Sequence, residues 1–273
     1  MKGCERKDQD KGSAFHFLFS TRTKVRETES PKRESQRDSN NNNSRKKRKM
    51  ALELIYFPLR GRGEPVRLAL ALAGVEYTEK AVDYMTMKST AGTESCPFGQ
   101  APIFKVGDFH ISQMDAITRY IARAHNLYGA TQQDAALIDM VLIGVESIRS
   151  EYTKLIYEKQ LSPEGLEAHK ALVLAQEGLN GRNGGAHFGY LNNILQRNEG
   201  GEGFVVGASV SIADVQLFDV VDLHLRDAIF GDLLRQTYPL LAAHHDRFAA
   251  IPAIASYLSS PLRQQKVNGN ALG

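Results

Sequence analysis

The chain has 273 residues, enough for one large domain or two modest ones, and its charge is unevenly distributed. Residues 1–50 carry fifteen Lys and Arg against seven Asp and Glu, whereas residues 51–273 carry nineteen against twenty-four. The acidic body argues against a reader of nucleic acid, and two cysteines, Cys4 and Cys96, provide neither a disulfide framework nor the spacing of a metal site.

Residues 1–49 are predicted to form a disordered, basic N-terminal extension, because they hold few aliphatic residues and an asparagine run. The apolar patch at 15–19 is too short for a membrane span or a secretory signal. The basic run from Arg45 to Lys49 is of a kind found in nuclear addresses and RNA-binding arms, although we expect neither. We therefore expect a cytoplasmic protein without membrane contact, or a nuclear one if this run is functional.

From residue 52 the pattern predicts strand, helix, strand. Three apolar residues lead into Tyr56, Pro58 ends the strand, a helix spans 64–73 before Gly74, and a second strand spans 77–82. Residues 85–99 are irregular, with a short helix. Strands at 103–106 and 109–111 flank the turn Gly107-Asp108, and a helix spans 113–126. This order predicts a small mixed sheet covered by helices, thioredoxin-like but without the Cys-x-x-Cys of dithiol exchange.

Beyond residue 130 the pattern is helical only. A long amphipathic helix spans 134–158, another begins at Ser162-Pro163, and Ser211 with Asp214 forms a capping box for a helix through residue 225. Shorter helices are predicted at 238–248 and 253–259, and the glycine-rich stretch 178–189 is expected to be a loop or hinge. The fold class is thus an α/β domain at 50–126 followed by an all-α domain at 132–273.

Tyr56 is the first candidate for chemistry. A phenol at the carboxyl end of a strand, close to a helix N-terminus, can donate a hydrogen bond to an anion such as a thiolate. The alternative is an ordinary half-buried tyrosine in a βα unit. The pair His244-His245 has no partner ligands at helical spacing, so no metal is expected.

Several motifs occur in an order that resembles the cytosolic glutathione transferases, most closely the pi class. They cover essentially all of 51–273 and lie in both predicted domains. The motifs are Tyr56-Phe57-Pro58 with Arg60-Gly61-Arg62, Gln100-Ala101-Pro102, Leu127-Tyr128-Gly129, Gln132-Gln133-Asp134, Phe204-Val205-Val206-Gly207 and Val267-Asn268-Gly269-Asn270.

The resemblance implies the glutathione transferase fold and a glutathione site. Tyr56 would activate the thiol of glutathione, Arg62 would order the loop beside it, and Gln113 with Met114 would hold the glutamyl end. Gln100, Ala101 and Pro102 would form a loop with a cis-proline that binds the cysteinyl part. Glutathione is a co-substrate in this scheme, and no metal takes part.

The resemblance also implies an electrophile pocket lined by Phe57, Leu59 and Tyr157. Phe98 would be the aromatic key that enters the partner subunit of a homodimer. The expected function is conjugation of glutathione to small hydrophobic electrophiles, that is, detoxification.

Four positions depart from the family pattern. Met87 and Thr93 replace a tryptophan and a lysine, Met114 replaces a serine, and Ser147 replaces an acidic residue that would come from the partner subunit. Lys88 is a candidate replacement for the lost cation. These departures favour an alternative, a weakly active or non-catalytic protein of the same fold that binds ligands or regulates partners.

Overall fold

The computed structural model describes residues 51–273, and the extension predicted at 1–49 lies outside the described residues. The elements follow the predicted order closely. The strands are β1 (Leu52–Tyr56), β2 (Thr78–Ala81), β3 (Ile103–Val106) and β4 (Phe109–Ser112), and the helices of this half are the 3₁₀ turn η1 (Gly61–Gly63), α1 (Glu64–Leu72), α2 (Tyr84–Ser89) and α3 (Met114–Ala124).

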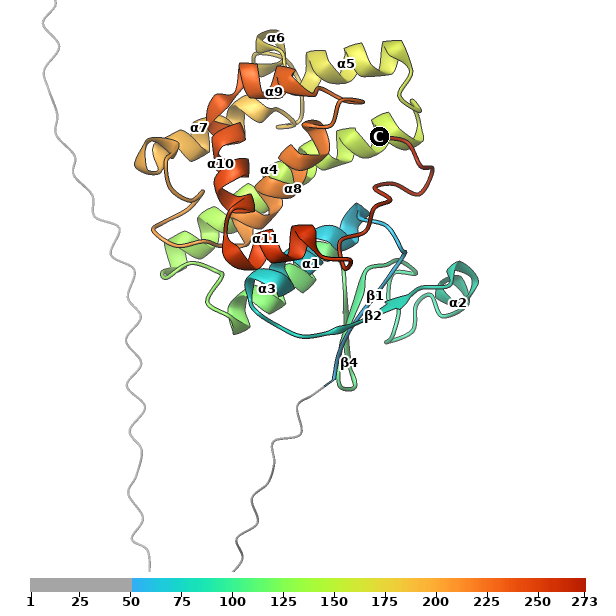
Figure 1. Ribbon diagram of the computed structural model, residues 1–273. Helices are drawn as coiled ribbons and strands as arrows, with labels where there is room; N and C mark the ends of the chain where they lie inside the picture. Colours follow the sequence, from blue (N-terminus) through green and yellow to red (C-terminus); the bar gives the residue numbers. More distant parts are fainter. Residues whose placement is uncertain (1–50) are drawn as a thin grey trace, which may run out of the picture. The chain divides into compact units, whose positions relative to one another are not determined.

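The four strands form one mixed sheet in the order β2-β1-β3-β4. β1 pairs with β2 in parallel and with β3 antiparallel, and Val106 pairs with Phe109 across the expected two-residue turn. α1 and α3 lie between the sheet and the other helices, and α2 projects beside the sheet (Figure 1). The predicted thioredoxin-like arrangement of an N-terminal domain is confirmed.

The remaining residues are helical, as predicted. Their elements are α4 (Gln132–Tyr157), α5 (Pro163–Val173), α6 (Gln176–Leu179), α7 (Phe188–Arg197), the 3₁₀ turn η2 (Glu199–Gly201), α8 (Ile212–His224), α9 (Asp232–Thr237), α10 (Pro239–Ala249) and α11 (Pro252–Ser259). α4 and α8 form the centre, with α7 and α10 packed around them (Figure 1). The domain limits expected near residues 126 and 132 stay predictions.

Two predicted features differ from the structure. The stretch 178–189, expected as a loop, contains the end of α6 and the start of α7. Gln113, expected as the first helical residue, instead precedes α3 in a left-handed backbone conformation, with φ 72°. Gln113 is therefore the residue before the helix and does not belong to it.

α8 is the helix around which the neighbouring helices pack. Its N-terminus carries the predicted capping box, in which the Ser211 hydroxyl accepts the N–H of Ala213 and the Asp214 carboxylate accepts the N–H of Ser211. Nearly every residue of α8 is buried, so this helix is enclosed by its neighbours. Against it pack α1, α4 and α10.

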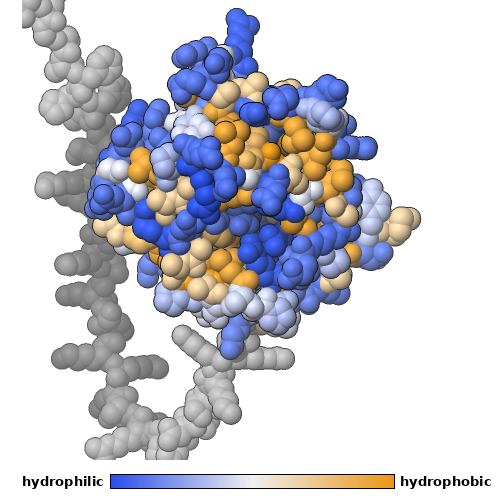
Figure 2. Space-filling view, turned by 45° about the horizontal axis from the view of Figure 1, so that its top comes forward, coloured by the Kyte–Doolittle hydropathy of each residue, from blue (hydrophilic) through white to orange (hydrophobic). Residues whose placement is uncertain are grey.

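The surface of the body is mixed. Figure 2 shows apolar residues in separate patches divided by charged side chains, without one continuous apolar band on the face in view. Within residues 51–273 no helix is both long and apolar enough to cross a membrane.

Candidate functional site

Tyr56 is the last residue of β1, and the loop that follows closes over its ring. Only 6% of Tyr56 is exposed. A Cβ atom on Gly63 would lie 2.4 Å from Tyr56 Cδ1, and one on Gly61 would lie 2.6 Å from the phenol oxygen. The loop can therefore approach the ring this closely because both positions are glycine.

The phenol oxygen accepts a hydrogen bond from the backbone N–H of Arg62 at 2.9 Å. Burial raises the pKa of Tyr56, and the bond from Arg62 together with the charge of Arg67 opposes that rise only in part. Tyr56 is thus protonated at neutral pH. Among residues 51–273 the Tyr56 O–H donates no hydrogen bond, and Tyr56 lines a small cavity.

The side chain of Arg62 connects this loop to α4. Its two terminal nitrogens donate to the two carboxylate oxygens of Glu146, at 2.9 and 2.5 Å. Burial by itself would lower the pKa of Arg62, but the bonds and charge of Glu146 raise it overall. Arg62 is therefore a fixed cation beside the phenol.

Most of the predicted site residues line one cleft of about 470 Å³, here called the first cleft. It combines apolar walls with charged groups from α2, α3 and α4. Its lining residues are Phe57, Arg62, Tyr84, Met87, Lys88, Gly99, Gln100, Ala101, Pro102, Gln113, Met114, Asp115 and Glu146. Predicted site residues from three separate segments, 57–62, 100–102 and 113–114, thus meet in one place.

The floor of the first cleft has an unusual backbone. The Ala101–Pro102 peptide bond is cis, as the resemblance implies. Gln113 has a positive φ that side-chain-bearing residues rarely adopt, and its side-chain Nε2 donates to Gln100 Oε1 at 3.1 Å. Met114 follows Gln113 and begins α3. The first N–H groups of a helix have no partner within the helix, and those of α3 lie at this cleft.

A second, smaller cavity of about 150 Å³ adjoins the phenol. Its lining residues are Tyr56, Leu59, Gly61, Arg62, Arg149, Tyr152, Thr153, Tyr157, Leu223 and Asn268. Arg62 lines both cavities. The second cavity brings together Leu59 and Tyr157, two of the three residues expected in the electrophile pocket.

Phe57, the third of these, lines the first cleft instead. Neighbouring residues of an extended backbone point to opposite sides, so Tyr56 and the residue after it line different cavities. The Phe57 ring meets the Tyr56 ring edge-on, with centroids 5.6 Å apart, and packs against the cluster of Met87, Cys96 and Ile103.

The four departing positions fall into two groups. Met87 and Met114 are buried and line the first cleft. Thr93 and Ser147 do not line it: the Thr93 hydroxyl donates to the Thr90 carbonyl at 2.7 Å, and the Ser147 hydroxyl donates to the Ile143 carbonyl at 3.2 Å. Their side chains are occupied locally.

Sequence reasoning missed Glu146 and Asp115 and named Lys88 only from its register. Glu146 belongs to a long amphipathic helix and gave no separate signal. Asp115 is two residues after Gln113, so its position at the start of a helix was the available clue. Lys88 lies 5.5 Å from the centroid of the Tyr84 ring and forms no ion pair with another described residue.

Phe98 lies apart from both cavities, and 65% of it is exposed. A group of three or more His, Cys, Asp or Glu that could hold a metal ion does not occur among residues 51–273.

Comparisons with known proteins agree with this geometry. Residues 52–123 match the family model described as glutathione S-transferase, N-terminal domain, and residues 148–261 match that of its C-terminal domain. Glutathione S-transferase P 1 of Bufo bufo is 36% identical over 218 residues, which are 80% of this chain and 96% of the relative. Glutathione S-transferase P of Homo sapiens is 35% identical over 219 residues, again 80% and 96%.

A solved structure gives the same result. The pi-class glutathione S-transferase of Onchocerca volvulus superposes with a TM-score of 0.66 and 28% identity, covering 82% of this chain and all of that one.

Proposed function

Because the chain belongs to the glutathione S-transferase family, a family of transferases, we propose that it conjugates glutathione to hydrophobic electrophiles and that Tyr56 activates the thiol. One observation carries this proposal. The Tyr56 O–H donates no hydrogen bond among residues 51–273. Arg62, whose backbone N–H donates to the phenol oxygen, lines both cavities.

The magnitudes are sufficient for this role. A thiol with a pKa near 8.5 is only a few per cent ionised at pH 7, and lowering that pKa by about two units takes roughly 2.7 kcal/mol. A charge-assisted hydrogen bond from a neutral phenol supplies about 1.5–3 kcal/mol. The thiolate then attacks the electrophilic carbon, a carbon–sulfur bond forms, and the leaving group departs with its electron pair or the double bond takes up a proton.

The first cleft suits a short peptide with charged ends. Ala101 presents its backbone before the cis bond, Gln113 and the start of α3 suit a carboxylate, and the Asp115 carboxylate suits an ammonium group. We assign the glutamyl end of glutathione to Gln113 and Met114 and the cysteinyl part to Gln100, Ala101 and Pro102.

The second cavity suits the electrophile. Leu59, Leu223 and the ring of Tyr157 give it apolar walls, and Arg62 with Tyr56 gives one polar side. The Tyr157 hydroxyl accepts the N–H of Gly269 at 2.9 Å, which holds its ring at the rim of the cavity. A small hydrophobic compound bound there would lie next to the thiol.

The experiment that tests this proposal is a glutathione titration followed by an aryl-halide conjugation assay on wild type and Tyr56→Phe. We expect saturable glutathione binding in both proteins. Near pH 6.5, kcat/KM should be about tenfold to a hundredfold lower in Tyr56→Phe, since the variant loses only the donor. Tyr190→Phe, far from both cavities, is the matched control and should turn over like wild type.

The losses at Met87, Thr93, Met114 and Ser147 favour a second candidate, a ligand-binding or regulatory protein of the same fold. Wild type that binds apolar ligands but shows no saturable glutathione binding would support it against the enzyme. Turnover unchanged in Tyr56→Phe would instead remove only the role given to Tyr56.

The cytoplasmic location expected from the sequence stays a prediction. Fractionation of cells that express the chain would test it.

A further inference from the structure

The residues after α11 return to the loop that holds Tyr56. We call residues 263–270 the C-terminal strap. The N–H of Arg60 donates to the Lys266 carbonyl at 2.8 Å, and the N–H of Gly61 donates to the Val267 carbonyl at 3.1 Å. Arg60 Nε also donates to the Gln264 carbonyl at 2.8 Å. Three hydrogen bonds thus join the strap to residues 60 and 61 of the loop.

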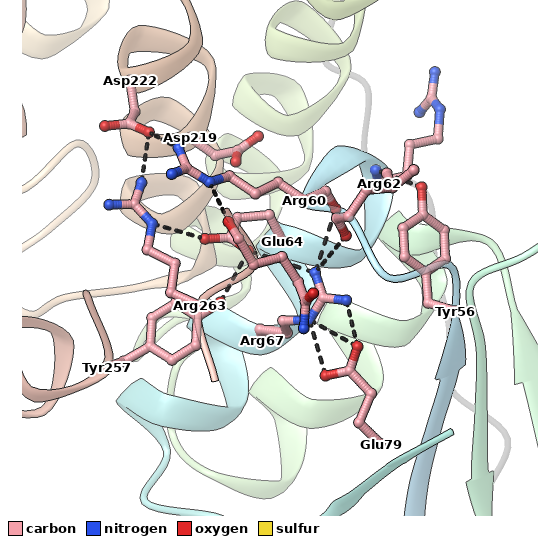
Figure 3. Close-up of polar contacts among 12 residues, drawn as sticks. Tyr56, Arg60, Arg62, Glu64, Arg67, Glu79, Asp219, Asp222, Tyr257 and Arg263 are labelled. Atoms are coloured by element: carbon pink, nitrogen blue, oxygen red, sulfur yellow. Dashed lines mark hydrogen bonds and ion pairs between the residues drawn. The ribbon is translucent and has the colours of Figure 1, made fainter. Parts of the chain in front are cut away.

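Arg263 anchors one end of the strap. Its Nε donates to Glu64 Oε1 at 3.3 Å and one terminal nitrogen donates to Asp222 Oδ2 at 2.7 Å (Figure 3). Glu64 starts α1 and only 2% of it is exposed, whereas Asp222 belongs to α8. A single guanidinium therefore joins both domains at the base of the strap.

The other end is held by α4. Asn268 Nδ2 donates to the Tyr152 hydroxyl at 2.8 Å, and Asn270 Nδ2 donates to the Ile156 carbonyl at 2.9 Å. With both ends fixed, residues 264–267 have little freedom to move away from the loop.

The backbone of the loop connects the strap to the phenol. The residue after Gly61 is Arg62, whose N–H binds the Tyr56 oxygen. On the side away from the strap, Arg67 donates to the Leu59 carbonyl at 2.9 Å. The loop is therefore held from two directions, by Arg67 from α1 and by the strap that Arg263 anchors.

We propose that Arg263 is a positioning residue for the Tyr56 hydroxyl, acting through the strap and the backbone of residues 60–62. This inference rests on the proposed function. Arg263 lines neither the first cleft nor the second cavity, so it touches neither substrate. Arg263 therefore affects the reaction only by fixing the direction in which the Tyr56 O–H donates its hydrogen bond.

The geometry of a guanidinium is needed for this role. Arg263 bonds two carboxylates in different directions, and a lysine ammonium of similar length would reach one of them well at best. Without Arg263, Glu64 keeps Arg67 and Tyr257 as partners, while Asp222 keeps Arg60 and His245. Both acids, the buried Glu64 and the partly buried Asp222, remain paired, so the main loss is the anchor of the strap.

The test measures the thiol pKa of bound glutathione, from thiolate absorbance against pH, in wild type, Arg263→Met and Arg263→Lys. The groups that face the phenol are Arg62, Arg67 and Tyr157, and all three stay in place in these variants. We expect the thiol pKa to rise by about half a unit in Arg263→Met and by less in Arg263→Lys. Such a rise lowers kcat/KM about twofold at pH 6.5 and about threefold well below the thiol pKa, and the difference should vanish above the thiol pKa. KM for glutathione should stay within about twofold of wild type.

Arg235→Met is the matched control, because Arg235 also pairs with a carboxylate, Asp246, but on the exposed surface. It should leave the thiol pKa unchanged. If Arg263→Met does not fold, Asp222→Asn weakens the same anchor with a smaller change and should shift the pKa in the same direction.

A folded Arg263→Met with the wild-type thiol pKa would overturn the inference, and so would a loss of rate that is equal at every pH. Failure of the proposed function looks different: wild type itself would show no bound thiolate, or Tyr56→Phe would retain it, and the inference would fall with it.

Discussion

At the scale of single residues, the two cations that line the first cleft, Arg62 and Lys88, differ in their ion pairs. Arg62 is neutralised by Glu146, whereas Lys88 forms no ion pair with any residue in the range 51–273. A ligand with a free carboxylate would supply the missing anion. We therefore assign Lys88 to the glycine carboxylate of glutathione.

Replacing Lys88 with Met should reduce the preference for glutathione over γ-glutamylcysteine, which lacks the glycine. Because Lys88 is exposed and its charge is screened, we expect a loss of about fivefold to tenfold in this ratio of dissociation constants. Isothermal titration of both peptides measures it. Lys80→Met, on β2 and outside the cleft, is the control, and an unchanged ratio in Lys88→Met would refute the assignment.

Motif residues were the easiest to locate from the sequence. Tyr56, Gln100 and Gln113 occur in short ordered patterns, so their meeting in one region could be expected from the resemblance. Glu146 could not, because its partner Arg62 is 84 positions away and nothing local distinguishes it from other acids of α4. Long-range ion pairs leave no periodic signal in one sequence.

At the scale of elements, two buried histidines join α5 to α8. His224 Nδ1 donates to the Val220 carbonyl at 2.7 Å, so its Nε2 accepts, and His169 Nε2 donates to it at 3.0 Å. Burial lowers the pKa of His169 to about 4. Burial also lowers the pKa of His224 well below its usual value, and the neighbouring His169 lowers the pKa of His224 further. Arg149 also opposes charge on His224, whereas Glu151 favours it on His169. Both rings are neutral in the folded protein.

The free energy of unfolding should fall as the pH is lowered. The unfolded chain binds protons on these rings near pH 6.5, whereas the folded protein does not, so their stabilising contribution is complete above pH 6.5 and is lost as the pH falls toward 4. Between pH 6.5 and 5 we expect the free energy of unfolding to fall by about 1.6 kcal/mol through His169, and His224 acts in the same direction. Urea unfolding at several pH values measures this slope.

His169→Phe should flatten that slope, because one titrating ring is removed and the stack on Phe230 is kept. The exposed His125→Gln is the control and should leave the slope unchanged. Equal slopes in wild type and His169→Phe would contradict the prediction.

Most elements could be predicted because each has its own signal. The apolar run before Pro58 located β1 with its observed bounds, and the Ser211 capping box located the start of α8. α7 was missed because glycines precede it and His187, an uncommon cap, accepts the N–H of Gly189. α9 was missed because it is six residues long and follows Gly231 without a side-chain cap.

At the scale of the whole molecule, an aromatic residue and a helix face suggest self-association. Phe98 is 65% exposed, and Leu137, Met140 and Ile143 form an exposed apolar row on α4. A cavity of about 210 Å³ between α4 and α7 is lined by Leu137, Met140 and Ile194 among others. We propose that Phe98 of each subunit enters this cavity of its partner in a symmetric homodimer.

Phe98→Ser should weaken that dimer. Burying one phenylalanine is worth about 1.5–3 kcal/mol, and symmetry counts it twice, so the dissociation constant should rise roughly a hundredfold or more. Light scattering across a dilution series measures the molar mass. Met85→Ser, equally exposed but on α2, is the control, and a wild type that is monomeric at every concentration would exclude the dimer.

The arrangement of the two domains was the part that residue patterns alone could not give. The strap, Arg263 and the pair Arg62–Glu146 all connect segments that are far apart in the chain. The sequence motifs implied this arrangement only through the resemblance to a family, since no local pattern records which surfaces meet.

The shared position of Arg62 links occupancy of the two cavities. A ligand that shifts this guanidinium from one side alters the wall that a ligand meets on the other. Thermodynamic reciprocity then requires that any factor by which an electrophile changes the affinity for glutathione equals the factor by which glutathione changes the affinity for the electrophile. Under the proposed function, the two ligands would be coupled through Arg62, and a tighter pair between Arg62 and Glu146 would uncouple them.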